Sequence, residues 1–331
     1  MSIDYVAEIK RLKEKLPVTV VGHFYQRDEV FNMADITGDS LELARKCKAD
    51  ENPWVVFCGV GFMGQSVKVV APHKRVLMPK VACCAMARMI DGRFFDESVE
   101  FMVSNGIAKE DILPITYINS DVSVKSKVGE MGGLVCTSSN AFKIIEKGLE
   151  SGKKILFVPD RCLGQNFANS MGLKSCIIGD GSDPKESDII CYDGFCSVHQ
   201  LFTLDDIEFY REKYPDILIA VHPECDPAIV KASDFSGSTS QLIKYVSELD
   251  ENQKVAVGTE YNLVNRMRPN GNTFVLSSTK PECPTMNETT LEDVYLALKS
   301  IEDNKPINEI LVDEHTSKWA NIALERMLDI K

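Results

Sequence analysis

The sequence is poor in positive charge and contains no long apolar run. It has 37 Lys and Arg against 49 Asp and Glu, a formal net charge of −12. Nucleic acids and anionic membranes bind basic surfaces, so this balance argues against both partners, although a small anionic substrate can still bind a locally positive pocket. No apolar stretch reaches the roughly 18 residues of a membrane span, and residues 1–17 have the pattern of a charged amphipathic helix rather than a signal peptide. We therefore expect a cytoplasmic protein with no membrane or nucleic-acid partner.

Cys-x-x-Cys pairs are also absent, although the chain has 11 cysteines. Structural zinc ribbons use such pairs, so we do not expect one. In a reducing compartment the cysteines do not form a disulfide framework, and roughly eight of them fit the role of small buried hydrophobic residues. Cys83 and Cys84 are adjacent, and one metal seldom binds two neighbouring cysteines. The question is which cysteines are distinguished by their position in the chain.

A repeat with a constant offset of 199 residues relates an N-terminal segment of the chain to a later one. The segment 20–40 matches 219–239 without gaps, and His23 falls on His222. Each segment is an apolar run that ends at a histidine and continues through a polar turn to a glycine followed by hydroxyl residues. Such self-similarity indicates repeated structural units.

The same offset continues to the cysteines. Cys84 falls on Cys283, whereas the cysteine before Cys84 falls on a glutamate. A middle copy between residues 113 and 199 has the same order of features with looser spacing, and it also ends near a cysteine. Because the spacing is irregular there, the repeat does not separate Cys191 from Cys196.

Strands alternate with helical stretches in each copy, as strand, helix, strand, helix and strand. This alternation predicts an α/β fold with parallel sheets. We expect three similar three-layer αβα domains around a pseudo-threefold axis, with the third strand of the middle copy within 175–180. Ligands bind at the carboxyl ends of strands in such sheets, so the polar residues there can converge on one site. The predicted limits are 1–86, 87–198 and 199–285 for the domains and 286–331 for two C-terminal helices.

The stretch GVGFMG at 59–64 follows a predicted strand and matches the glycine pattern of dinucleotide-binding sites. That pattern needs an acidic residue about 20 positions later to hold the ribose, and residues 65–90 contain no Asp or Glu. The corresponding position in the last copy also lacks the pattern. A nicotinamide oxidoreductase is therefore disfavoured, and we interpret the stretch as a tight turn between strand and helix.

Three hydroxyl-rich turns, TGDS, CTSS and SGSTS, stand where helices are expected to begin. Any one of them is explained by ordinary N-capping. Their recurrence in three copies favours anion binding, because the free N–H groups and the dipole of a helix N-terminus attract carboxylates and phosphates.

Cysteines close the three copies: Cys84, Cys283, and either Cys191 or Cys196. One interpretation is that they are core residues that align by chance. The other is that three thiolates share one metal centre, which suits an iron–sulfur cluster with one iron that lacks a protein ligand. Such an iron acts as a Lewis acid on a carbonyl or hydroxyl group.

His222 and Glu224 in VHPEC lie two residues apart, so at the end of a strand they point the same way. Glu224 is a candidate general base and His222 a candidate donor to an oxyanion; the alternative for the histidine is a structural role. His199 is a further polar candidate, and Cys225 is interpreted as structural. The remaining two histidines, His73 and His315, are expected on the surface.

The stretches GHFYQRDEVFNMADITGDSLELAR, YINS, CTSSNA, PDRCLG, GFCSVHQ, VHPEC, SGSTSQ and VGTE together resemble the quinolinate synthase A family. The resemblance spans roughly residues 18–300. It implies three similar α/β domains around a pseudo-threefold axis. It also implies an enzyme of NAD biosynthesis, a transferase that condenses iminoaspartate with dihydroxyacetone phosphate and releases quinolinate, phosphate and water.

The resemblance further implies a [4Fe–4S] cluster with three protein ligands and one open iron. The ligands are Cys84, Cys196 and Cys283, and the family motif selects Cys196 over Cys191. Cys83 is then expected to pack beside the cluster. Glu224 is implied as the main acid/base, with Tyr25 and His222 in the catalytic set. The implied substrate-binding residues are His23, Ser40, Tyr117, Asn119, Ser138, His222, Glu224 and Thr239.

Two other functions compete with this interpretation. An iron–sulfur hydro-lyase acting on a small hydroxy acid uses the same open iron without a phosphate pocket. A non-catalytic iron–sulfur protein would not need polar residues at the strand ends. If the family function holds, an aspartate-oxidising enzyme is the expected functional partner that supplies iminoaspartate.

Overall fold

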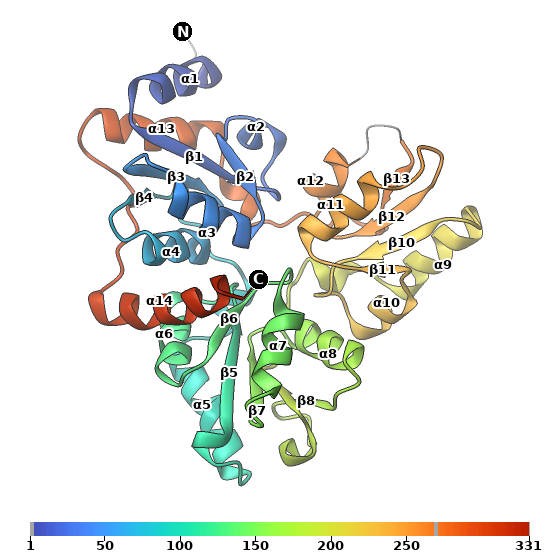
Figure 1. Cartoon of the computed structure of the whole chain (residues 1–331). Coiled ribbons are helices and arrows are strands. Elements are labelled where there is room, and N and C mark those ends of the chain that lie inside the picture. The colour runs from blue at the N-terminus through green and yellow to red at the C-terminus, as the bar shows by residue number, and fades with distance from the viewer. Residues whose placement is uncertain (1–2, 268–270, 331) are drawn as a thin grey trace.

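Three parallel β-sheets form the framework of the computed structural model, which describes residues 3–267 and 271–330 (Figure 1). The first sheet has the spatial order β2 (Ile36–Gly38), β1 (Val18–His23), β3 (Trp54–Cys58) and β4 (Arg75–Leu77). The third sheet repeats this order with β11 (Phe235–Ser236), β10 (Leu218–Val221), β12 (Val255–Gly258) and β13 (Thr273–Val275). The second sheet has β6 (Leu134–Cys136), β5 (Ile112–Tyr117), β7 (Lys154–Val158), β9 (Ile189–Cys191) and β8 (Ser175–Ile177).

Each sheet is covered by helices on both faces, and the three resulting αβα units surround a common centre in Figure 1. The predicted fold class is therefore confirmed. Helices of the first unit are α1 (Tyr5–Lys15), α2 (Asp28–Phe31), α3 (Ser40–Ala49) and α4 (Gly61–Val70). Those of the second are α5 (Gly92–Ser104), α6 (Val122–Glu130), α7 (Ala141–Leu149) and α8 (Arg161–Ser170). Those of the third are α9 (Leu204–Lys213), α10 (Pro227–Ala232), α11 (Thr239–Ser247) and α12 (Tyr261–Arg266).

The central strands are buried along their whole length. Every residue of β1 and β5 is buried, which explains why both read as continuous apolar runs rather than as alternating patterns. Because all ladder partners are parallel, the carboxyl ends of the strands lie at the same edge of each sheet. This edge faces the common centre, so the residues that follow the strands of all three domains are brought together.

Two details of the strand pattern differ from expectation. Residues 175–177 do form a strand, β8, but it lies at the outer edge, and β9 occupies the place equivalent to β4 and β13. Each sheet also contains a short strand that we did not predict, β2, β6 or β11, with only two or three residues. Strands this short carry no periodic signal. The domain limits at 86, 198 and 285 remain a prediction.

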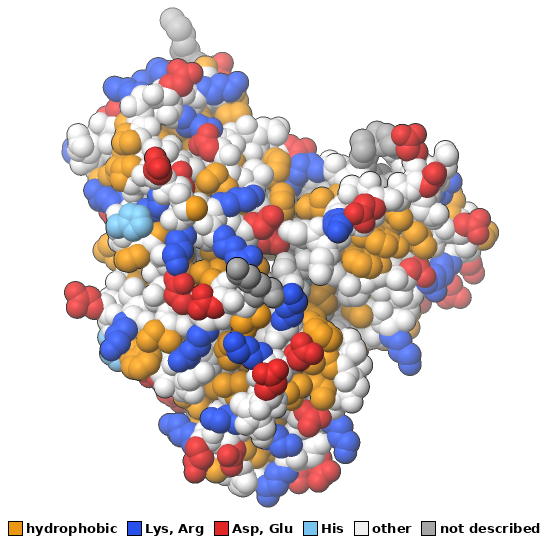
Figure 2. Space-filling view, viewed as in Figure 1, with side chains coloured by type: hydrophobic (Ala, Val, Ile, Leu, Met, Phe, Trp, Pro, Cys, Tyr) orange, Lys and Arg blue, Asp and Glu red, His pale blue; other side chains and the backbone are white. Residues whose placement is uncertain are grey.

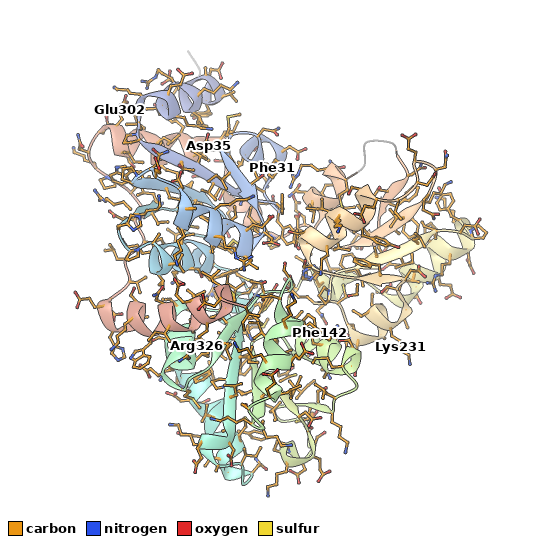
Figure 3. The ribbon with its side chains drawn as sticks, viewed as in Figure 1. Phe31, Asp35, Phe142, Lys231, Glu302 and Arg326 are labelled. Carbon is orange, nitrogen blue, oxygen red and sulfur yellow. The ribbon has the colours of Figure 1, made fainter. Side chains whose placement is uncertain are left out.

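The C-terminal segment contains the two expected helices, α13 (Leu291–Glu302) and α14 (Glu314–Leu328). They return to different domains. Helix α13 packs on α1, where Glu302 accepts hydrogen bonds from Arg11 and Lys15. Helix α14 packs on α6, and Arg326 donates to the carbonyl of Gly133 at 2.9 Å (Figure 3). The C-terminal segment thereby contacts the first domain through α13 and the second domain through α14.

On the face shown in Figure 2, acidic and basic side chains are interspersed over the surface. Both predicted surface histidines, His73 and His315, are exposed. Within residues 3–267 and 271–330, no helix combines the length and the apolar content that crossing a bilayer requires.

Candidate active site

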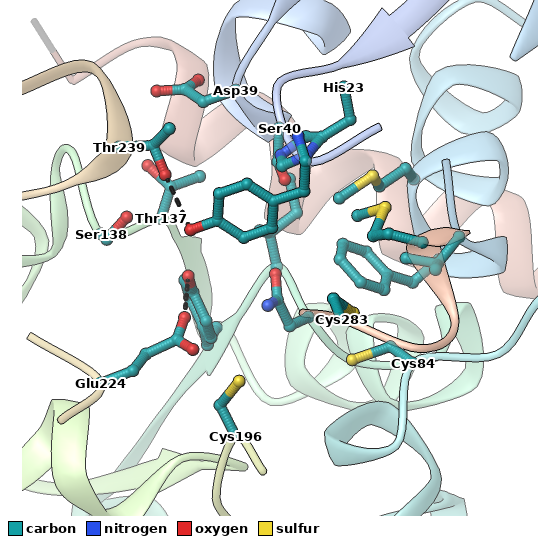
Figure 4. Close-up of a pocket in the computed structure, with 18 of the residues that line it drawn as sticks. His23, Asp39, Ser40, Cys84, Thr137, Ser138, Cys196, Glu224, Thr239 and Cys283 are labelled. Carbon is teal, nitrogen blue, oxygen red and sulfur yellow. Dashed lines mark hydrogen bonds between the residues drawn. The ribbon is translucent and has the colours of Figure 1, made fainter. Parts of the chain in front are cut away.

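A central cavity lies where the three domains meet (Figure 4). Every residue that the sequence singled out for catalysis, substrate binding or metal binding lines it. These residues are His23, Tyr25, Ser40, Cys84, Tyr117, Asn119, Ser138, Cys196, His222, Glu224, Thr239 and Cys283.

His23 and His222 end equivalent stretches of the first and third domains and have equivalent hydrogen bonds. The Nδ1 atom of His23 accepts from the N–H of Tyr25 at 3.1 Å, and that of His222 accepts from the N–H of Glu224 at 3.3 Å. Burial lowers the pKa of His23 to about 4 and that of His222 to about 3. Both imidazoles are therefore neutral at pH 7, and each keeps its proton on Nε2 as a hydrogen-bond donor.

Glu224 is a buried carboxylate held from two sides. Tyr117 Oη donates to Glu224 Oε1 at 2.5 Å, and His199 Nδ1 lies 2.9 Å from Glu224 Oε2. Burial alone would raise the pKa of this carboxyl group, but the imidazoles of His199 and His222, together with these hydrogen bonds, keep it below its usual value. Glu224 is therefore ionised at pH 7 and able to accept a proton.

Tyr25 connects the first domain to the third. Its hydroxyl lies 3.2 Å from Thr239 Oγ1 and 3.1 Å from Thr259 Oγ1. Thr259 in turn lies 3.1 Å from His199 Nε2. Burial, and next the charge of Glu224, raise the pKa of Tyr25 well above its ordinary value. The tyrosine therefore stays protonated and is able to donate one hydrogen bond.

The three cysteines lie in equivalent turns, one in each domain. The helix that precedes each cysteine donates an N–H from its first residue to the carbonyl two positions before the cysteine. The pairs are Gly61 with Ala82, Arg161 with Gly194 and Tyr261 with Pro281, at 2.8, 2.8 and 2.9 Å. The glycine-rich stretch 59–64 thus forms the predicted turn between strand and helix, and the first N–H of its helix binds the cysteine loop.

The chain after each cysteine also turns in the same way. The carbonyl of Cys84, Cys196 or Cys283 accepts an N–H from the residue four positions later, at 3.2 Å in all three cases. Burial raises the pKa of these thiols, to about 12 for Cys84, while backbone N–H groups of the turns oppose the rise. The three sulfur atoms border the same part of the cavity in Figure 4.

Other cysteines lie outside this arrangement. Cys191 belongs to β9 and is fully buried in the core of the second domain. Cys225 is also fully buried, as expected for a structural residue, and its Sγ lies 3.7 Å from the carbonyl of Gly258. Cys83 was expected to pack beside the ligands, and this is wrong: its side chain is exposed because the loop turns only Cys84 inward.

A second set of potential metal ligands combines Cys196 with a histidine and a carboxylate. Atoms of Cys196, His199 and Glu224 all lie within 4.8 Å of one another. His199 and Glu224, however, already bond to each other, and the imidazole also bonds Thr259. The donors that remain free to face a metal are therefore sulfur atoms, and thiolates are the donors typical of iron–sulfur clusters.

The hydroxyl-rich turns lie at another side of the cavity (Figure 4). Ser40 is the first residue of α3 and Thr239 the first of α11. Ser138 lies in a turn before α7, whose N-cap is Asn140. The expectation that all three stand at a helix start therefore holds for two of them, and in the middle domain the turn is longer.

Sequence reasoning missed two polar residues at or next to the cavity, Asp39 and Thr259, and left the partner of His199 open. The sequence gives His199 no defined partner, whereas in the structure it bonds Glu224. Its position three residues after Cys196 was the sequence feature that placed it near the site. Asp39 was absent from the prediction, although it lines the cavity beside Ser40. Thr259 was also absent, because a fully buried threonine within VGTE has no distinguishing pattern in the sequence.

Comparison with known proteins gives one consistent result. Residues 7–329 match the family model described as Quinolinate synthetase A protein. The chain is similar to the quinolinate synthase of Helicobacter pylori (strain HPAG1), with 52% identity over 99% of this chain and 98% of the relative. It is also similar to the quinolinate synthase of Streptomyces coelicolor, with 38% identity over 98% of this chain and 88% of the relative. The quinolinate synthase of Bacillus pumilus is 39% identical over 94% of this chain and 88% of the relative. The chain belongs to the quinolinate synthase family.

Proposed function

We propose that this protein is a quinolinate synthase that condenses iminoaspartate with dihydroxyacetone phosphate. One carbon–carbon and one carbon–nitrogen bond form, and quinolinate, one phosphate and two water molecules leave. The observation that carries the proposal is the common location of all twelve predicted residues around one cavity. These residues come from three domains and from distant parts of the chain, so their convergence is a property of the fold.

Binding of two anionic substrates is assigned to the neutral histidines and the hydroxyl turns. The Nε2–H groups of His23 and His222 are donors without a positive charge, so they can bind a carboxylate or a developing oxyanion. Ser40, Ser138 and Thr239 add hydroxyl groups at the other side. Asn119 is also suited to a ligand, because its buried Oδ1 has no hydrogen-bond partner among the described residues.

Proton transfer is assigned to Glu224. It is ionised, buried and bonded to His199 and Tyr117, so its position is fixed and its proton affinity can respond to the charge of a bound substrate. Dehydration and phosphate loss both require a group that takes a proton from carbon or nitrogen and returns one to a leaving oxygen. Tyr25 remains protonated and can donate a hydrogen bond to a substrate oxygen between the two sides of the cavity.

The cysteines Cys84, Cys196 and Cys283 are assigned as ligands of a [4Fe–4S] cluster. Their equivalent turns, their sulfur donors and their common side of the cavity fit such a group. When bound, the cluster would supply a Lewis acid at the iron that has no protein ligand. The histidines and Glu224 would orient the substrate oxygens.

The decisive experiment is anaerobic purification with iron and sulfide counting, followed by incubation with both substrates. The matched pair of variants is Cys84→Ser and Cys83→Ser, which make the same change at adjacent positions. The wild type and Cys83→Ser should hold about four irons per chain and form quinolinate. Cys84→Ser should lose iron and activity.

Two outcomes separate the components of the proposal. A full, active cluster in Cys84→Ser would overturn the ligand assignment. A full cluster in the wild type without quinolinate formation would overturn the reaction. In that case, dehydration of a small hydroxy acid would identify a hydro-lyase, and absence of any turnover would indicate a non-catalytic iron–sulfur protein.

Production of iminoaspartate in the cell is assigned to an aspartate-oxidising enzyme.

A further inference from the structure

Asp39 brings the three domains together at a single carboxylate. It is the N-cap of α3, where Oδ1 accepts from the N–H groups of Leu41 at 3.0 Å and Glu42 at 2.9 Å. Its other oxygen accepts from Ser139 Oγ of the second domain at 3.1 Å and from Ser240 Oγ of the third domain at 2.7 Å. The residue is only 7% exposed. One side chain therefore receives donors from all three domains.

Helix capping alone does not require this carboxylate. The equivalent position in the third domain is Ser238, which caps α11 with a single oxygen that accepts from Gln241 N at 3.3 Å. A serine in place of Asp39 would cap α3 equally well, since Glu42 would complete a capping box. The second oxygen of Asp39 is thus free of any function within its own helix and serves the contacts between domains.

These contacts reach the turns that carry the proposed substrate-binding hydroxyls. Ser40 follows Asp39, Ser138 precedes Ser139, and Thr239 precedes Ser240. We propose that Asp39 is a positioning residue that holds the three hydroxyl turns in register around the substrates. The proposal rests on the proposed function in assigning those turns to substrate binding.

The hydrogen bonds also explain how a carboxylate is accommodated beside a pocket for anions. A bare carboxylate would repel a substrate phosphate or carboxylate. Here two backbone N–H groups and two hydroxyl groups point at Asp39, which spreads its charge and orients the hydroxyls. Hydrogen bonds to a charged acceptor are stronger than neutral ones. The carboxylate of Asp39 therefore connects the domains more rigidly than a neutral hydroxyl group at the same position would.

The test uses the substitution Asp39→Ser, which keeps a side-chain oxygen for the helix cap and removes the second oxygen together with the negative charge. Ser139→Ala and Ser240→Ala remove one donor each. Ser247→Ala is the matched control, because it makes the same change in α11 where, among the residues that the structure describes, the hydroxyl bonds only the carbonyl of Lys244. Iron content and thermal unfolding establish that each holoprotein is folded and loaded.

Hydrogen exchange provides a readout that does not depend on turnover. In Asp39→Ser, the segments 134–142 and 236–244 should exchange faster than in the wild type, although neither contains the substitution. The amides of α3 should keep their protection because the cap is retained. Unchanged exchange in both distant segments would overturn the proposal.

Kinetics provide the second readout. Asp39→Ser loses both hydroxyl donors, and Ser139→Ala and Ser240→Ala lose one each. Each variant should raise the KM of at least one substrate about three- to tenfold with kcat within about twofold. The double variant Asp39→Ser with Ser240→Ala should be no worse than Asp39→Ser alone, because both remove the same bond. Additive effects, or a KM as unchanged as that of Ser247→Ala, would contradict the proposal. If the protein forms no quinolinate but shows the exchange effect, the reaction is wrong and the role of Asp39 stands.

Discussion

At the scale of single residues, the burial of His23 makes the stability of the folded protein depend on pH. Its pKa in the folded protein is about 4 against an ordinary value of 6.5, because burial disfavours the imidazolium; Asp39 and Glu224 favour the charged form, and Arg266 opposes it. Between these two values the unfolded chain binds more protons than the folded one. The stability that folding retains while His23 is neutral is therefore fully present above pH 6.5 and is lost as the pH falls toward 4.

We predict that His23 accounts for a loss of about 2 kcal/mol in unfolding free energy between pH 7 and pH 5. In His23→Gln the side chain cannot be protonated, so the decrease over this range should be smaller by about that amount. Anaerobic urea titrations at the two pH values measure it. His73→Gln, at an exposed histidine, should keep the wild-type pH dependence, and an unaltered slope in His23→Gln would contradict the burial argument.

The residues of the site divide into those that sequence can find and those that it cannot. Cys84, Cys283, His23 and His222 follow from a constant offset along the chain, since a duplicated fold places equivalent residues at equivalent positions. Asp39 bonds Ser240, which lies 201 residues away in the chain, and Thr259 bonds Tyr25, which lies 234 residues away. Their roles depend on how the domains pack, and no local pattern encodes that packing.

At the scale of elements, the contact between α6 and α14 depends on Gly129. A Cβ atom added there would lie 2.0 Å from the backbone carbonyl oxygen of Trp319. Alanine normally favours a helix over glycine, but in this position it must push α14 away. We predict that Gly129→Ala lowers the free energy of unfolding by about 1–3 kcal/mol.

Thermal or urea unfolding of the holoprotein tests this prediction. The control is Gly92→Ala at the first residue of α5, where the added Cβ meets the flexible end of Lys127 at 2.8 Å. It should change stability by less than about 0.5 kcal/mol. Stabilisation by Gly129→Ala would show that the two helices adjust their spacing without cost.

The elements themselves were predictable where a long apolar run or a clear cap marks them. The six-residue strands β1 and β5 and helix α1, which ends before Pro17, follow from such signals. The short edge strands β2, β6 and β11 do not, since they exist only because a longer neighbour offers hydrogen bonds. The exchange of places between β8 and β9 likewise depends on an insertion in the second domain, whose path the sequence leaves open.

At the scale of the whole molecule, a chain of hydrogen bonds crosses the cavity from one domain to the next. It runs from Thr239 through Tyr25 and Thr259 to His199, and then through Glu224 to Tyr117. Thr259 is fully buried and does not line the cavity. Its hydroxyl nevertheless joins the tyrosine of the first domain to the histidine that orients Glu224, so it acts through these two residues.

We predict that Thr259→Val lowers kcat/KM for quinolinate formation about 10- to 100-fold. Valine has the same shape but leaves Tyr25 and His199 without a shared partner, and each buried polar group that loses a bond weakens the orientation of the next. Thr259→Ser retains the hydroxyl and should stay within about threefold of the wild type. Iron content should be unchanged in both variants, since Thr259 contacts no cysteine through a hydrogen bond in the described part of the chain. If Thr259→Ser loses as much activity as Thr259→Val, packing of the methyl group and not the hydrogen-bonded chain determines the geometry of the site.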